Sequence, residues 1–173
     1  MQTSLYSVTI PTFKKGLTAL SGLLDKAEAY LKEKGAPESE LLEKRFAPDM
    51  FPFVKQVQLV SDQAKALAAR LNGVDPVSMP DTETTIAELK ERIAKTIAVL
   101  DAVKPEEVDG KETTEVRIKW FPGQHILGGH YAMEYILPNF FFHLTTAYDL
   151  LRAEGVQIGK GDFIGGLSLR DDA

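Results

Sequence analysis

The sequence contains no cysteine among its 173 residues. Disulfide bonds, cysteine nucleophiles and thiolate metal ligands are therefore excluded within this chain. It also lacks a run of about 18 apolar residues, so we expect no segment to span a membrane. The first residues, MQTSLYSVTIPTFKKG, have neither the basic start nor the continuous apolar core of a signal peptide. We therefore expect a cytoplasmic protein.

Blocks of positive charge are missing as well. The net charge is -5, the pI is near 5.3, and the lysines and arginines are scattered among acidic residues. Binding to nucleic acid or to an anionic membrane is therefore not expected. The charged fraction of 26% and the hydrophobic fraction of 44% are typical of a globular protein. The length suits a single domain over residues 1–173 with a substantial core.

Apolar residues recur at helical spacing through the first half of the chain. They predict a long helix from Leu5 to Lys34, which Pro11 would kink in its first turns and Gly35 would end. A short helix is expected within Pro37–Arg45. A second long helix is expected from about residue 51 to residue 71, before the Asn-Gly pair that follows it.

The second half begins with a connection that contains two prolines. The third long helix would start near Asp81 or Thr82, with further capping residues from Thr84 to Glu88, and would end before Pro105. The alternation in ETTEVRIKW, followed by FPGQ, predicts a β-hairpin within residues 112–127, with Val116, Ile118 and Trp120 on one face.

A fourth long helix is predicted from Gly128 to about Glu154, with Pro138 bending it. The glycine-rich tail would pack back through Phe163 and Ile164. Four long helices with one long middle connection indicate an all-α fold, a four-helix bundle with a small β-hairpin between helices three and four.

The fourth predicted helix carries a polar row within an apolar sequence. Tyr135, Asn139 and His143 are spaced by four residues, so their side chains share one face. An imidazole nitrogen is a good ligand for zinc, nickel or iron, and helix bundles often hold such sites between facing helices. The alternative is structural: His143 is hydrogen-bonded in the core, and Asn139 satisfies the backbone that Pro138 disturbs.

The second helix carries Gln56, Gln58 and Asp62. These side chains could approach His143 if the second and fourth helices pack side by side. The amphipathic pattern alternatively predicts an exposed polar face for at least two of the three. His130 is thirteen residues before His143, so at about 100° per residue it points elsewhere on the helix. His125, His130 and His143 could meet only if the hairpin folded over the end of the bundle.

Three segments carry a resemblance to a known family: SLYSVTIPTFKKGLTALSGLLDKAEAY, RFAPDMFPFVKQVQLVSDQAK and LPNFFFHLTTAYDLLRAEGVQIGKGDFIG. The chain resembles the DinB/YfiT-like superfamily of four-helix-bundle metalloenzymes. Within it, the chain is similar to an uncharacterised bacterial branch, a domain of unknown function that carries the PNFFFH motif. The resemblance covers nearly the whole chain.

The resemblance implies a divalent metal held by three histidines, one on helix two and two in an H-x-x-x-H pair on helix four. His143 is followed by Arg152 and Gly155 at the superfamily's usual offsets, so it resembles the third ligand. The preceding ligand position then falls on Asn139. Helix two has no histidine, and Gln56 or Gln58 is nearest to the remaining position.

Amides at two of three ligand positions imply weak binding of borderline metals. We therefore expect no cofactor, with a weak zinc or nickel site at His143 as the alternative. The first functional hypothesis is a small-molecule-binding protein, whose ligand would contact Gln56, Gln58, Tyr135, Asn139 and His143. The second is a metal-dependent enzyme of the superfamily type, thiol transferase or isomerase-like, centred on His143. The third is a structural module. We expect a homodimer, because superfamily members often pair.

Overall fold

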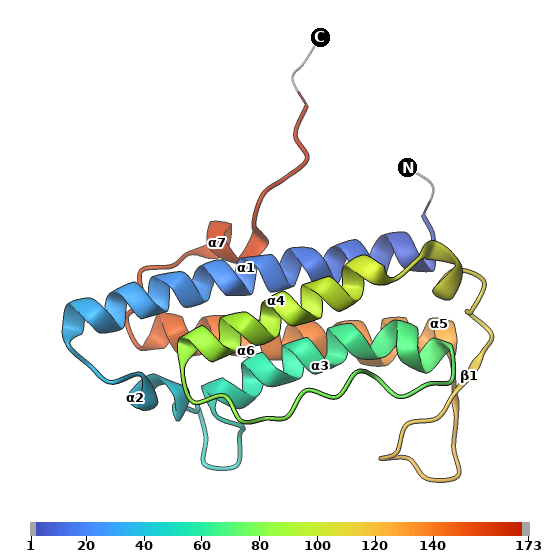
Figure 1. The fold of residues 1–173 in the computed structure, drawn as a ribbon, viewed down its shortest axis with the longest axis horizontal. Coiled ribbons are helices and arrows are strands. Elements are labelled where there is room, and N and C mark those ends of the chain that lie inside the picture. Colours follow the sequence, from blue (N-terminus) through green and yellow to red (C-terminus); the bar gives the residue numbers. More distant parts are fainter. Residues whose placement is uncertain (1–2, 171–173) are drawn as a thin grey trace.

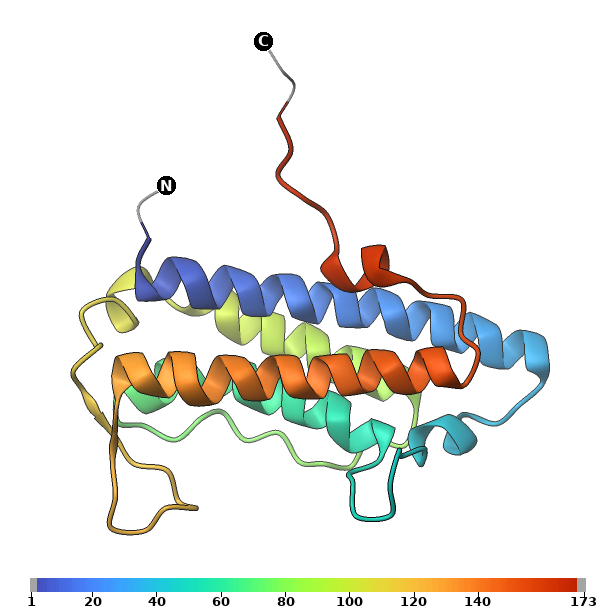
Figure 2. The same cartoon turned by 180° about the vertical axis from the view of Figure 1, so that it is seen from behind.

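The computed structural model describes residues 3–170, and four long helices form an elongated bundle (Figures 1 and 2). They are α1 (Leu5–Lys34), α3 (Phe53–Leu71), α4 (Ile86–Ala102) and α6 (Leu137–Ala153). Helices α1 and α6 run in one direction, and α3 and α4 run in the other. The expected four-helix bundle is confirmed. Within the described range, no helix has the length and apolarity that a membrane crossing needs.

Short elements connect the long helices. They are α2 (Glu38–Leu42), η1 (Pro105–Glu107), β1 (Glu115–Val116), β2 (Ile126–Leu127), α5 (Gly128–His130), η2 (Tyr131–Ile136) and α7 (Lys160–Ile164). Helix η2 is a π-helical segment that continues directly into α6, with Pro138 in the first turn of α6. The irregularity that we expected near Pro138 is therefore a π-helical segment just before the proline, and such segments are frequent at functional sites.

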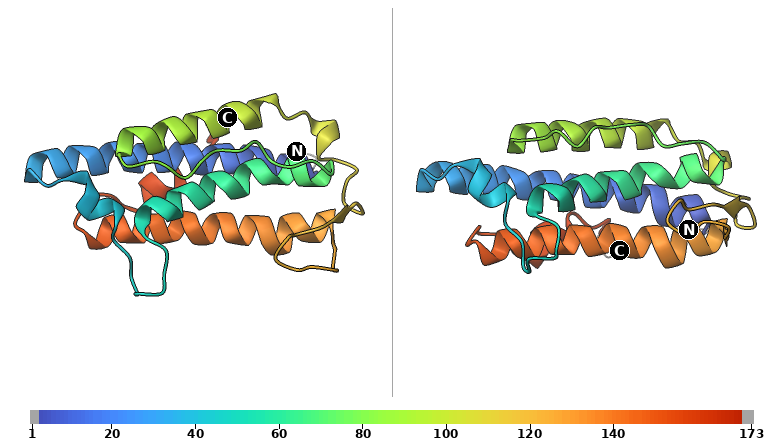
Figure 3. Two further views of the ribbon diagram at one scale, coloured as in Figure 1. Left: turned by 60° about the horizontal axis from the view of Figure 1, so that its bottom comes forward. Right: turned by 90° about the horizontal axis from the view of Figure 1, so that it is seen from below.

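The connection between α3 and α4 runs the length of the bundle. These residues, 72–85, are called the strap below, and they return along α3 so that α4 runs parallel to it (Figure 3). Helix α4 begins at Ile86, later than the predicted Asp81 or Thr82. The reason is local: Thr85 and Glu88 form a capping box, which satisfies backbone N–H groups at that start.

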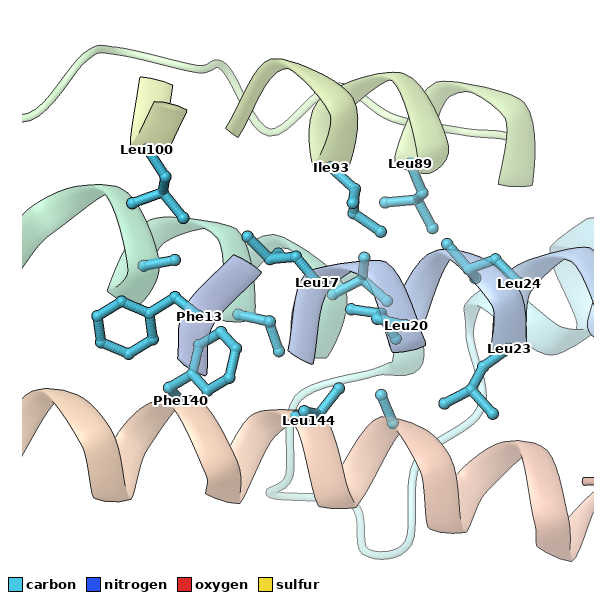
Figure 4. Packing of buried hydrophobic residues seen from close by; sticks show 14 of the residues in the cluster. Phe13, Leu17, Leu20, Leu23, Leu24, Leu89, Ile93, Leu100, Phe140 and Leu144 are labelled. Carbon is cyan, nitrogen blue, oxygen red and sulfur yellow. The ribbon is translucent and has the colours of Figure 1, made fainter. Parts of the chain in front are cut away.

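Helix α1 lies at the centre of the hydrophobic core. Its leucines contact α4 through Leu89 and Ile93 on one side, and α6 on the other (Figure 4). Phe13 of α1 packs against Phe140 of α6 with ring centroids 4.9 Å apart. Burying large apolar side chains is the main stabilising contribution to such a bundle.

The β-hairpin is much shorter than the sequence predicts. Only Glu115 with Leu127 and Val116 with Ile126 pair, in antiparallel register. The prediction that the strand continues to Trp120 is wrong, since Trp120 is 68% exposed while Val116 is buried. Beyond Val116 the chain forms a loop with no ladder partner, so the alternating pattern does not produce a strand there.

The C-terminal segment packs back on the bundle, as expected. The ring of Phe163 lies edge-on to Tyr148 of α6, with centroids 5.6 Å apart, and Lys26 of α1 bonds Asp162 at 2.6 Å. Ile164 is 40% exposed, so the expectation that it also anchors the tail is wrong. The residues 160–164 form α7 instead of an irregular loop.

Two glycines of α1 should respond oppositely to alanine. A Cβ at Gly16 would lie 2.7 Å from the Phe140 ring, whereas nothing lies within 4 Å of a Cβ at Gly22. Gly16→Ala should lower the free energy of unfolding by about 1 kcal/mol through overpacking. Gly22→Ala should raise it by about 0.5–1 kcal/mol through helix propensity. Urea denaturation measures both, and equal changes would contradict the close α1–α6 packing.

Candidate functional site

Helices α3 and α6 run antiparallel and pack side by side (Figure 2). His143 of α6 faces a glutamine in the first turn of α3. Gln56 is 1% exposed and His143 is 7% exposed. The Nδ1 atom of His143 lies 2.7 Å from Oε1 of Gln56. The structure therefore distinguishes the two glutamines that sequence spacing could not: Gln56 faces His143.

The hydrogen bonds of Gln56 define the tautomer of His143. Nε2 of Gln56 donates to the backbone carbonyl of Phe51 at 2.9 Å. A carbonyl only accepts, so the amide NH₂ must face Phe51 and the amide oxygen must face the imidazole. Nδ1 of His143 therefore carries the proton, and the lone pair is on Nε2.

His143 is neutral at physiological pH. Burial, together with charge repulsion from the nearby Lys55 ammonium, lowers the pKa of His143 to about 4. Nε2 is not among the fully buried polar atoms that lack a partner within residues 3–170, so it retains some contact with solvent. The site thus offers one neutral imidazole nitrogen, Nε2, whose lone pair is not used within the described residues.

The other glutamine faces a different neighbour. Gln58 is 4% exposed, and its Nε2 donates to Oε2 of Glu83 in the strap at 2.9 Å. Asp62 is also partly covered, and its Oδ1 forms an ion pair with Nζ of Lys65 at 2.9 Å. The expectation that at least two of Gln56, Gln58 and Asp62 form an exposed face is therefore wrong. The strap covers this side of α3 and supplies the polar partners.

A buried arginine holds the strap against the two helices. Arg92 of α4 is 2% exposed, and its guanidinium bonds Asp62 at 2.8 Å, Asp81 at 3.0 Å and Glu83 at 2.9 Å. Although burial opposes it, hydrogen bonds from Arg92 and Gln58 lower the pKa of Glu83 below its usual range. These charge-assisted bonds connect α3, α4 and the strap.

The other two residues of the predicted polar row precede His143 along the chain: Asn139 is in the first turn of α6 and Tyr135 is in η2. Asn139 is partly buried, and its Nδ2 donates to the backbone carbonyl of Tyr135 at 2.8 Å. This bond agrees with the structural interpretation of Asn139, which satisfies backbone close to Pro138. The ring of Tyr135 stacks on Tyr131, with centroids 5.8 Å apart and an interplanar angle of 17°.

A cleft of about 600 Å³ opens beside these stacked tyrosines, between α3, the strap and the β1–β2 loop. Its lining includes Leu59, Asp62, Lys65, Ala66, Arg70, Asp75, Val77, Met79, Asp81, Ile118, Lys119, Trp120, Tyr131 and Tyr135. Of this set, sequence analysis singled out Asp62 and Tyr135 as candidates. Tyr131 lies four residues before Tyr135, and that spacing was the available signal for a tyrosine pair on one face.

The donor set around His143 does not fit the metal of the superfamily. One imidazole nitrogen is available, while the amide oxygen of Gln56 already accepts from Nδ1 of that ring. The amide of Asn139 is turned to Tyr135. Residues 3–170 contain no group of three histidine, aspartate or glutamate side chains arranged to hold a metal. A single imidazole with engaged amides is a poor ligand set for zinc or nickel.

Comparisons with known proteins agree with the fold. A family model described as "Domain of unknown function (DUF1993)" matches residues 5–164. The crystal structure of a DinB family member protein from Shewanella denitrificans matches with a TM-score of 0.92 and 36% sequence identity. The match covers 97% of this chain and 96% of that chain. No curated protein is significantly similar to this sequence.

The buried imidazole should make stability depend on pH. Because the folded-state pKa of His143 is about 4 and the ordinary value is 6.5, the unfolded chain binds the proton first as pH falls. The contribution of the neutral ring is complete above pH 6.5 and decreases progressively down to pH 4. The wild type should therefore lose more unfolding free energy over this range than His143→Gln.

Denaturant unfolding of both proteins at several pH values measures this difference. His125→Gln is the matched control, since it replaces an exposed histidine, and it should follow the wild type. Parallel curves for the wild type and His143→Gln would contradict a buried neutral His143.

Proposed function

This chain belongs to the DUF1993 family of DinB-like helical bundles, and we propose that it binds a small molecule in the cleft beside Tyr131 and Tyr135. The observation that carries the proposal is a cleft of about 600 Å³ with a stacked tyrosine pair in its wall. Typical small-molecule sites have volumes of roughly 300–1,000 Å³, aromatic walls and a few polar groups. The cleft has a volume in this range and aromatic side chains in its wall, together with several charged groups.

The residues around the cleft support binding more than those around His143. Gln56, Gln58 and Asn139 each have a hydrogen-bond partner within the protein, so a ligand at these amides would have to replace it. Replacing a satisfied buried hydrogen bond brings little net gain. Of the predicted ligand-binding residues, Tyr135 is the one on which this proposal rests.

The position of Trp120 allows the proposal to be tested directly. It is the single tryptophan of the chain, it is 68% exposed, and it lines the cleft. A ligand in the cleft should therefore change tryptophan fluorescence and raise the melting temperature. We propose a screen of small aromatic acids, alcohols and amines with both readouts.

Trp120→Ala should weaken any such ligand severalfold, since an aromatic contact is worth about 0.5–1.5 kcal/mol. Its exposed side chain makes the variant's own stability close to that of the wild type. Calorimetric titration with the strongest compound measures the loss of affinity. Phe46→Ala, which removes another exposed aromatic ring, is the control and should bind as the wild type does. Equal affinity in Trp120→Ala and wild type would contradict binding in this cleft.

We also propose that the protein forms a homodimer through an aromatic patch of Phe51 and Phe142. Each of these side chains is more than half exposed. Phe51 and Phe142 flank the Gln56–His143 pair: Phe51 supplies the carbonyl that Gln56 bonds, and Phe142 contacts the imidazole edge-on at 5.2 Å. Exposed clusters of this kind are typical of protein interfaces, and two-fold dimers are the commonest oligomers.

Phe142→Ser should shift the protein from dimer toward monomer, because it removes apolar area from the proposed interface. Sedimentation velocity over a range of protein concentrations measures the shift. Trp120→Ser is the matched control, since it removes another exposed aromatic ring outside the patch. A wild type that stays monomeric at high concentration would contradict the dimer.

A further inference from the structure

We infer that the ligand of this cleft has a flat, mostly apolar body and a carboxylate, as an aromatic carboxylic acid has. The inference rests on the proposed function, since it names the chemical class that the same cleft would recognise. Three features carry it: an unpartnered tyrosine hydroxyl, an arginine with free donors, and acidic residues that are already paired.

The hydroxyl of Tyr131 lacks a partner although the residue is almost fully covered. Tyr131 is 3% exposed, and its hydroxyl has no hydrogen bond within residues 3–170. Buried polar groups are nearly always hydrogen-bonded, so an exception requires a reason. The hydroxyl is not a fully buried atom and the residue lines the cleft, so its remaining accessible surface faces the cleft. A ligand acceptor there would supply the missing partner.

The Tyr131 hydroxyl is a donor at neutral pH. Burial raises the pKa of Tyr131 far above its ordinary value, while the nearby positive charge of Arg70 opposes this rise. The phenol therefore keeps its proton and can donate to a carbonyl or carboxylate oxygen. Arg70 and Tyr131 both line the cleft, so the charge of Arg70 can act on a ligand group in it.

The guanidinium of Arg70 has N–H donors beyond those of the nitrogen that bonds Asp75. One of its terminal nitrogens, Nη1, bonds Asp75 at 3.0 Å, and the Asp75 side chain is 90% exposed. An ion pair that exposed contributes little, so a ligand carboxylate can compete with it or share the guanidinium. Arginine binds carboxylates in a bidentate manner, which gives affinity and orientation together.

The acidic residues of the cleft do not favour a cationic ligand. Asp62 bonds Lys65 and Arg92, and Asp81 bonds Arg92 and Lys55. These carboxylates are therefore neutralised within the protein. At the mouth, the Lys119 ammonium lies 4.3 Å from the Trp120 ring centroid, the place that a cationic ligand would take.

The walls suit a flat apolar body. Tyr131 and Tyr135 are stacked and line the cleft from η2, while Trp120 and Ile118 line it from the β1–β2 loop. Aromatic rings favour offset stacking and edge-to-face contacts with other rings. A ligand whose ring lies against these walls would direct its carboxylate toward Tyr131 and Arg70.

Three probes with one body and different charges test the class: 3-phenylpropionate, 3-phenylpropanol and 3-phenylpropylamine. Titration of the full chain, followed by tryptophan fluorescence and calorimetry, should give the carboxylate about tenfold higher affinity than the alcohol, with the amine weakest. Arg70→Gln should remove most of the difference between carboxylate and alcohol. Tyr131→Phe should weaken both of these probes severalfold.

Matched controls separate these effects from general damage. Arg152→Gln and Tyr148→Phe make the same chemical changes outside the cleft and should bind the carboxylate as the wild type does. Equal affinity for all three probes, or a preference for the amine, would overturn the carboxylate class. If Trp120→Ala still weakened the binding of these probes, the cleft would remain a ligand site although the carboxylate class was wrong. Failure of all three probes, together with no response in the wider screen, would overturn both proposals.

Discussion

The buried guanidinium of Arg92 is the interaction on which the candidate site depends. It bonds carboxylates of α3 and of the strap, so it ties the strap to the helices that the strap crosses. The strap returns the chain so that α4 runs parallel to α3, and the strap also forms one wall of the cleft. Loss of the guanidinium would leave Glu83 without a cationic partner, while Asp62 would keep Lys65 and Asp81 would keep Lys55. Arg92 therefore stabilises both the path of the strap and one wall of the cleft.

The two ends of the α3–α6 contact have different chemistry. At the beginning of α3, Gln56 bonds His143 and the backbone of Phe51, so this pair is satisfied within the protein. This is the region where the superfamily would place metal ligands. Toward the end of α3, Arg70 lines the cleft together with Tyr131, whose hydroxyl has no partner within the described residues. The unpartnered Tyr131 hydroxyl and the open cleft are the reasons for proposing that the ligand binds at this second end.

Much of the fold followed from the sequence because its determinants are local. The period of apolar residues and the glycine after Lys34 predicted α1 with its observed bounds. The start of α4 did not follow, because several capping residues precede it and the sequence does not show that Thr85 forms the capping box. The burial of Gln58 did not follow, because it depends on contact with the strap. Gln56 and Gln58 could not be distinguished by spacing alone. Tyr131 was not a candidate in the sequence, because the cleft that it lines exists only once the strap and the β1–β2 loop are in place.

The most direct test of the account is to map a bound probe by NMR on protein with labelled tyrosine and histidine side chains. On addition of 3-phenylpropionate, the account predicts that the ring signals of Tyr131 and Tyr135 shift, while those of His143 stay unchanged. A shift of the His143 imidazole with unchanged tyrosine signals would contradict it, because the ligand would then lie at the Gln56–His143 pair.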